Sequence, residues 1–208
     1  MSLDLNLISA YSIIAPILIG AIYLRSYSLV IRLLFFFVCL TGVLELASGI
    51  FMAYGINNLV FFHVHVYLEF TFIALIFFLT FDSITWRAIT LGCAAIFYVY
   101  SAFNAIFYEA VDLFNSNQRY VEGLMILFFC TGYFISLMRR PVHRYLEKQP
   151  MFWLTSGFLI YFAGTLYLFL VSKELMAINK LQYWTIHSVL NIGLNAIYVL
   201  AFLKERKL

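Results

Sequence analysis

The chain has 208 residues, of which 64% are hydrophobic and only 11% are charged, and its formal net charge at pH 7 is +3. This composition excludes a soluble globular domain, because so much apolar surface needs lipid to cover it. We therefore expect an all-α, polytopic protein of the cell membrane that contacts lipid and has no nucleic-acid partner.

Seven apolar tracts are long enough to cross a hydrocarbon core, which takes about 20 residues of helix. In chain order they predict transmembrane helices over 7–24, 28–54, 59–81, 86–108, 119–138, 150–172 and 181–203. The N-terminal segment lacks the basic region and cleavage pattern of a signal peptide, so we expect the first helix to be retained. The connecting loops are short, so residues 1–208 are predicted to form a single domain whose function lies within the bundle.

The basic residues predict an orientation with the N-terminus outside and the C-terminus in the cytoplasm. This orientation puts ten of the thirteen Lys and Arg residues on the cytoplasmic side, as the positive-inside rule requires. The ten are Arg25, Arg32, Arg87, Arg139, Arg140, Arg144, Lys148, Lys204, Arg206 and Lys207, and the three predicted to lie outside are Arg119, Lys173 and Lys180. The loop with Arg139, Arg140 and Arg144 could also dock a partner or anionic lipid, although a topology signal is the simpler interpretation.

Two pairs of similar segments suggest an internal repeat. TGVLELASG (41–49) and SGFLIYFAG (156–164) share one pattern of small residues, and HVYLE (65–69) is matched by HSVLN (187–191). If both matches are real, helices 1–3 and 5–7 are parallel copies joined by helix 4, a 3+1+3 arrangement. The alternative is convergent packing, since small residues at this spacing let any two helices approach closely.

Two carboxylates lie deep in the predicted bundle. Glu69 is about ten residues, or roughly 15 Å, from the outer end of its helix, and Glu45 lies at a similar depth. A charge at this depth is costly and marks a candidate functional site. His65, His187 and Asn104 also fall in the outer halves of their helices. The sequence therefore predicts one polar ligand pocket in the outer half.

Helical geometry indicates which histidine shares a helix face with Glu69. Residues four apart lie about 40° apart around a helix, whereas residues two apart lie about 200° apart. His65 and Glu69 therefore share a face, and His63 points away from it, to another helix or the headgroups.

A polar stripe at a spacing of four, comprising His187, Asn191 and Asn195, is expected to face inward. For Asn191, Asn195 and Asn104, interhelical hydrogen bonding is the stronger interpretation, although Asn191 and Asn104 stay candidates for the pocket. Glu122, one turn from the surface, is expected to snorkel.

Three segments carry a resemblance to a known family: NNLVFFHVHVYLEF (57–70), FWLTSGFLIYFAGTLYLFL (152–170) and WTIHSVLNIGLNAIYVLAF (184–202). They resemble an uncharacterised family of bacterial seven-helix membrane proteins whose genes often neighbour sensor histidine kinases. The resemblance implies a role in signalling and a histidine kinase as partner, and it implies no reaction.

Three functions fit these residues. The first is a membrane sensor in which a ligand or proton occupies the pocket of His65, Glu69, Glu45 and His187 and shifts helix packing. The second is an intramembrane hydrolase with zinc on His65, His187 and Glu69. The third is a small-solute or proton-coupled transporter. Retinal is not expected, because a retinal protein needs a lysine in the middle of helix 7 and Lys180 precedes that helix.

Overall fold

The computed structural model describes residues 2–139, 145–170 and 184–205. Within these ranges seven helical segments are long and apolar enough to cross a membrane, at positions close to those predicted, so the chain is a multi-pass, all-α membrane protein. The first span combines α1 (Ser2–Ser12), α2 (Ile14–Tyr23) and the short η1 (Leu24–Ser26). The others are α3 (Leu29–Ala53), α4 (Leu59–Thr80), α5 (Ile84–Phe107), α6 (Ser116–Met138), α7 (Pro150–Leu170) and α9 (Trp184–Glu205).

The first span is interrupted between α1 and α2. Pro16 has no N–H to donate to the carbonyl of Ser12, one turn earlier, and its ring crowds that carbonyl. The helix accordingly breaks at Ile13.

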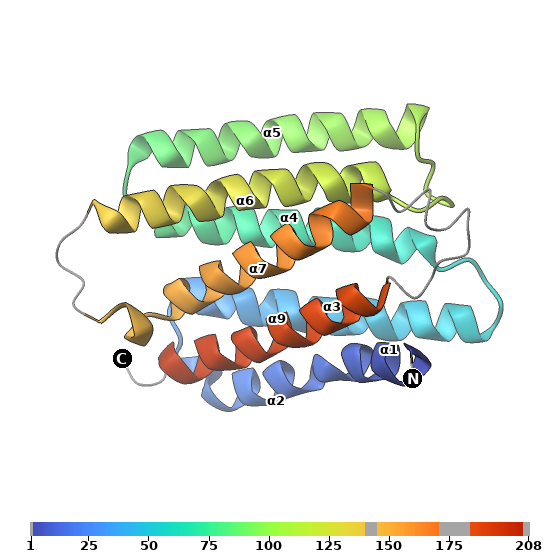
Figure 1. The fold of residues 1–208 in the computed structure, drawn as a ribbon, viewed down its shortest axis with the longest axis horizontal. Coiled ribbons are helices and arrows are strands. Elements are labelled where there is room, and N and C mark those ends of the chain that lie inside the picture. The colour runs from blue at the N-terminus through green and yellow to red at the C-terminus, as the bar shows by residue number, and fades with distance from the viewer. Residues whose placement is uncertain (1, 140–144, 171–183, 206–208) are drawn as a thin grey trace.

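Six of the spans form a closed ring. The first span packs against α3, α3 against α4, α4 against α6, α6 against α7, α7 against α9, and α9 returns to α1 and α2. Helix α5 packs on α4 and α6 from outside this ring, and Figure 1 shows it at the edge of the bundle opposite α1 and α2. Helices 1–3 and 5–7 thus lie on either side of the ring with helix 4 outside it, although the predicted repeat itself stays a prediction.

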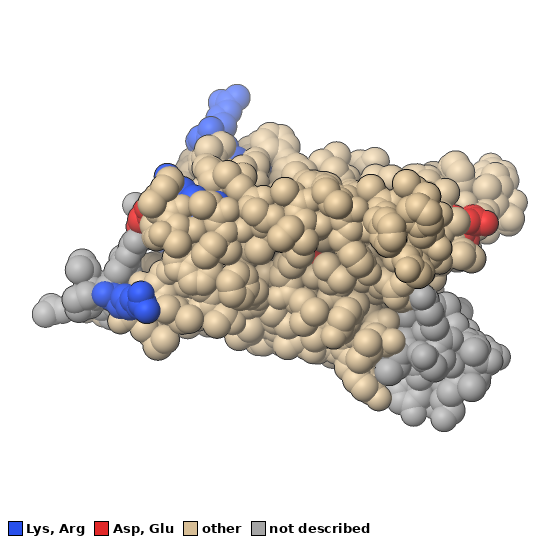
Figure 2. All heavy atoms as spheres, turned by 90° about the horizontal axis from the view of Figure 1, so that it is seen from above, with Lys and Arg blue, Asp and Glu red and all other residues tan. Residues whose placement is uncertain are grey.

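The two ends of the bundle differ in charge. Six of the seven described Lys and Arg residues lie at the end that carries Glu205, which we call the C-terminal end. Figure 2 shows the blue side chains gathered there, a red patch at the opposite, N-terminal end and a surface almost free of charge between the two. The seventh cation, Arg119, belongs to the N-terminal end and is almost fully buried. The uncharged middle is the surface expected of a lipid-facing belt.

Aromatic rings fill the half of the core nearer the C-terminal end. Phe70 and Phe97 stack at 3.9 Å between ring centroids, and Phe77 contacts the rings of Phe129 and Phe158. All five side chains are fully buried. The polar side chains that could form a site are therefore concentrated nearer the N-terminal end.

Candidate functional site

The register of α4 against α6 brings the polar side chains together. Both helices begin at the N-terminal end, and α6 starts about one turn deeper, beside the fourth residue of α4. A hydrogen bond from Asn115 Nδ2 to the Phe62 carbonyl, 3.1 Å long, fixes this offset. Arg119 in the first turn of α6 consequently lies level with His65 and Glu69 of α4.

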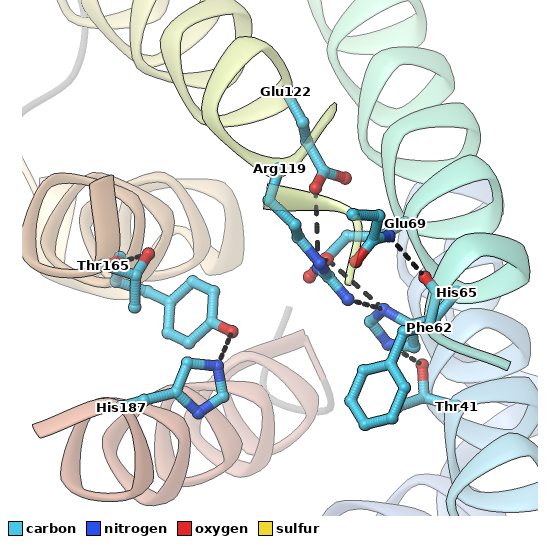
Figure 3. A network of polar contacts seen from close by, with 10 residues as sticks. Thr41, Phe62, His65, Glu69, Arg119, Glu122, Thr165 and His187 are labelled. Carbon is cyan, nitrogen blue, oxygen red and sulfur yellow. Dashed lines mark hydrogen bonds and ion pairs between the residues drawn. The ribbon is translucent and has the colours of Figure 1, made fainter. Parts of the chain in front are cut away.

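Arg119 is the centre of this group (Figure 3). Its Nη1 forms an ion pair with Glu69 Oε2 and lies 3.5 Å from Glu122 Oε2, while its Nη2 donates to His65 Nδ1 at 2.9 Å. The other ring nitrogen of His65, Nε2, lies 3.3 Å from Thr41 Oγ1 of α3. We call Thr41, His65, Glu69, Arg119 and Glu122 the Arg119 cluster; it ties three helices together.

The cluster is largely removed from solvent and lipid. The side chain of Glu69 is 3% exposed and that of Glu122 is 0% exposed, whereas His65 keeps 19% of its surface accessible. A buried ion pair is expensive to form, and removing one partner leaves an uncompensated charge. The Arg119 cluster is thus held only while its charges stay matched.

The hydrogen bonds determine the tautomer of His65. A guanidinium has donors only, so His65 Nδ1 must accept from Arg119 and carries no proton. The ring is then neutral with its proton on Nε2, which donates to Thr41 Oγ1. Protonation of Nδ1 would abolish the bond to Arg119 and place two cations side by side.

A second polar pair lies across the ring from the cluster. The Tyr161 hydroxyl of α7 and Nε2 of His187 on α9 are 3.2 Å apart, and His187 lies across the interior from His65 in Figure 3. Both are close enough for the charges of Arg119 and Glu69 to act on them. Phe169 lies between the two groups, with Arg119 Cζ 5.8 Å from its ring centroid and His187 5.9 Å from it.

Of the four strongest sequence candidates, the structure joins His65 and Glu69 in the cluster and places His187 across the interior from them, where it pairs with Tyr161. Glu45 is half-buried on α3, one turn beyond Thr41, and has no hydrogen bond or ion pair to any described residue.

Asn104 and Asn191 do not join the cluster. Asn104 Nδ2 donates to Glu109 Oε2 at 3.0 Å, beyond the end of α5, and its Oδ1 accepts from Asn117 Nδ2 of α6 at 3.3 Å. Asn191 donates to Ser9 Oγ at 2.9 Å, so this part of the predicted stripe turns toward hydroxyl partners on α1, whereas His187 faces Tyr161 of α7. The interhelical interpretation therefore describes both asparagines better than the pocket does.

His63 points away from His65, as its spacing predicts. Its Nε2 lies 2.9 Å from the carbonyl of Leu113, so it holds the loop over residues 108–115 rather than a headgroup. In the same loop, the buried carboxylate of Glu109 accepts from Ser116 Oγ and from the backbone N–H of Asn117. A carboxylate at this position satisfies orphan N–H groups and complements the helix dipole. The loop therefore caps the helix on which Arg119 stands.

Sequence reasoning missed Arg119 and misplaced Glu122. Because the fifth helix was predicted to begin at 119, Arg119 was assigned to the outer surface and Glu122 was expected to snorkel. The helix begins at Ser116 instead, and both side chains turn inward, Arg119 to Glu69 and Glu122 to Arg119. The available signal was the spacing of three between Arg119 and Glu122, which places opposite charges on one face of a helix.

The zinc arrangement finds no support in this geometry. Among the described residues no three His, Cys, Asp or Glu side chains are grouped to hold a metal. Arg119 instead contacts both His65 Nδ1 and Glu69 Oε2, and its positive charge opposes a second cation there. In the basic loop, Arg139 is exposed, and Arg140 and Arg144 lie outside the described residues.

Comparison of the chain with models of protein families, with curated proteins and with solved structures found no match.

Proposed function

We propose that this protein is a membrane sensor in which a small ligand or proton from the side of the N-terminal end acts on the Arg119 cluster and changes how α4 packs against α6. One observation carries the proposal: Arg119 of α6 pairs with Glu69 and His65 of α4 in a buried site near that end. Any input that alters the charge of the cluster alters the bond between the two helices.

The packing of the core between the Arg119 cluster and the C-terminal end favours a sensor over a transporter with an open pathway. A transporter needs polar groups on both sides of its binding site, whereas the core beyond Glu69 is filled by Phe70, Phe77 and Phe129. In a sensor, a change of charge in the cluster needs only to move the far end of a helix. Helices α4 and α6 both run from the cluster to the C-terminal end, so a shift in their packing reaches it directly.

The remaining parts of the proposal concern location and partner. The basic C-terminal end faces the cytoplasm, as the positive-inside rule favours, and the membrane is the bacterial cell membrane. The basic loop that begins at Arg139 contacts a histidine kinase there. This partner follows from the family resemblance, and the exposed side chain of Arg139 is compatible with it.

Trp184 provides a reporter for the test. Its indole ring lies 6.0 Å from the ring of His187, 6.1 Å from Phe169 and 5.5 Å from Phe114 of the 108–115 loop, measured between centroids. In a Trp86→Phe, Trp153→Phe background Trp184 is the only tryptophan, and excitation selective for tryptophan reports on it alone. We expect a change of pH, applied to the protein in lipid nanodiscs, to shift its emission in one transition that Glu69→Gln abolishes.

Two controls assign the transition to the cluster. His187 touches Trp184 and could alter its emission directly, so the titration is repeated with His187→Asn, in which the transition must persist. Asn195→Ala removes an interhelical hydrogen bond from α9 to α1, outside the cluster, and should leave the transition unchanged. An emission that does not respond to pH, or a transition that survives in Glu69→Gln, would contradict a sensor built on this cluster.

A proton-coupled transporter is the second candidate, favoured by the ring of six helices with α5 outside it. In that case α4 and α6 separate to open a path, and Glu69 carries the proton. Proton-driven solute uptake into vesicles that Glu69→Gln abolishes would support transport, and proton uptake without solute flux would support the sensor.

A further inference from the structure

The Arg119 cluster contains more negative than positive groups. Arg119 Nη1 faces two carboxylates, Glu69 Oε2 in close contact and Glu122 Oε2 at 3.5 Å. His65 is the neutral tautomer, as its bond to Arg119 requires. With both carboxylates ionised, the cluster would carry one uncompensated negative charge.

The neighbouring helices offer nothing to compensate this charge. The titratable groups of the neighbouring helices near the site are His65 on α4, Tyr161 on α7, His187 and Tyr198 on α9, and Glu45 on α3, which is itself acidic. Helix α5 has no Lys, Arg or His from Ala88 to its end at Phe107, so it supplies no cation either. An uncompensated charge in this setting costs several kcal/mol, which a single bound proton removes.

The contacts of the two carboxylates differ. Glu69 is in close contact with Arg119, and its Oε2 is also 3.4 Å from His65 Nδ1. Glu122 is fully buried, makes only the longer contact to Arg119, and its Oε1 has no hydrogen-bond partner among the described residues. The ionised form therefore belongs on Glu69.

We propose that Glu122 is a proton-binding site: it is a neutral carboxylic acid at rest, and its proton controls whether Arg119 binds α4. When Glu122 loses the proton to water, its carboxylate competes for the guanidinium from a position three residues along the same helix. Arg119 then moves toward Glu122, and the contact between α6 and α4 weakens. This inference rests on the proposed sensor function and names the proton as its ligand.

Two further side chains mark a route for the proton. Asn115, Gln118 and Glu122 follow one another at spacings of three and four, so they share one face of α6. Asn115 Oδ1 and both amide atoms of Gln118 are buried and, like Glu122 Oε1, have no partner in the described part of the chain. Buried polar groups are normally hydrogen-bonded, commonly to ordered water. Water along this face would connect Glu122 with the N-terminal end.

The test is infrared spectroscopy of the protein in lipid, which separates the carbonyl band of a protonated carboxylic acid from the bands of carboxylates. It is done in a Glu45→Gln background, because Glu45 is half-buried and could give a band of its own. At neutral pH we expect one buried-acid band. Glu122→Asp should shift its frequency, Glu69→Asp should leave it in place, and Glu122→Gln should remove it.

Charge balance adds a sharper expectation. Glu69→Gln frees Arg119 to ionise Glu122, so the band should disappear although Glu122 is still present. Glu109→Gln is the matched control: Glu109 is also buried, but Asn104, Ser116 and Asn117 donate to it, so it is ionised and its loss should not change the band. A parent protein without the band, or a band that shifts in Glu69→Asp and not in Glu122→Asp, would overturn the proposal.

The infrared result is independent of signalling. A band assigned to Glu122 together with an unresponsive Trp184 would retain the proton site and reject the sensor function. A Trp184 transition with no band from Glu122 would retain the sensor and reject this site. Circular dichroism of each variant shows that its helices are intact.

Discussion

Arg119 donates a hydrogen bond to His65 at 2.9 Å, although both side chains are cations when fully protonated. The bond exists because His65 is neutral, and it links α6 to the face of α4 that also carries Glu69. Two helices are therefore joined through groups whose charge can change, which is the property a switch requires.

Replacing Arg119 should destabilise the protein strongly. Arg119→Met leaves Glu69 without its cation in a buried site, a change that typically costs about 3–5 kcal/mol. Thermal or denaturant unfolding in detergent micelles measures the loss, with exposed Arg139→Met as the control. The triple variant Arg119→Met, Glu69→Met, Glu122→Met should recover much of it, since an apolar replacement of a buried charge group is often neutral. If the triple variant is no more stable than Arg119→Met, the cluster stabilises the protein by more than the mutual neutralisation of its charges.

Glu109 should hold the start of α6 in place. Glu109→Ala removes the acceptor of Ser116 Oγ and the Asn117 N–H, and leaving buried donors unpaired costs about 1–3 kcal/mol. Hydrogen exchange should show faster exchange of the first-turn amides of α6 and little change in α9. Uniform acceleration throughout the bundle would contradict a local capping role.

The sequence was sufficient for the number and positions of the helices, because lipid requires long apolar tracts whose ends can be counted. It also placed His65 and Glu69 on one face and turned His63 away. It failed at Arg119, whose position depends on where α6 begins, and that start is set by the 108–115 loop through Asn115 and Glu109. Loop contacts of this kind leave no periodic pattern to recognise.

Gly157 and Gly49, which occupy different positions in the two similar patterns, should respond differently to substitution. A Cβ on Gly157 of α7 would lie 2.6 Å from Ile197 Cγ2 of α9, so Gly157→Ala should force the helices apart at a cost of about 1–3 kcal/mol. Gly49 of α3 has open space where a Cβ would go, and Gly49→Ala should be tolerated. Unfolding measurements on both variants decide this, with Ile197→Ala expected to rescue Gly157→Ala. Equal losses at the two sites would contradict the packing described.

The contact between α9 and α1 should act as a modest polar link. Asn195 Nδ2 donates to Ser12 Oγ at 2.7 Å, and interhelical hydrogen bonds in membranes average about 0.6 kcal/mol. A double-mutant cycle with Asn195→Ala and Ser12→Ala should return a coupling energy of this size. A coupling of several kcal/mol would indicate that this pair, rather than the Arg119 cluster, dominates the polar energetics.

The predicted orientation can be tested with single cysteines. After Cys39, Cys93 and Cys130 are replaced by Ala, one cysteine is introduced at Tyr54, which is 79% exposed at the N-terminal end, or at Tyr145, which is 57% exposed at the C-terminal end. In intact cells a membrane-impermeant maleimide should label Tyr54→Cys, and it should label Tyr145→Cys only after permeabilisation. This outcome follows from the six cations at the C-terminal end, since basic loops are retained in the cytoplasm. The opposite pattern would place the Arg119 cluster near the cytoplasm, and its input would then be an internal ligand or proton.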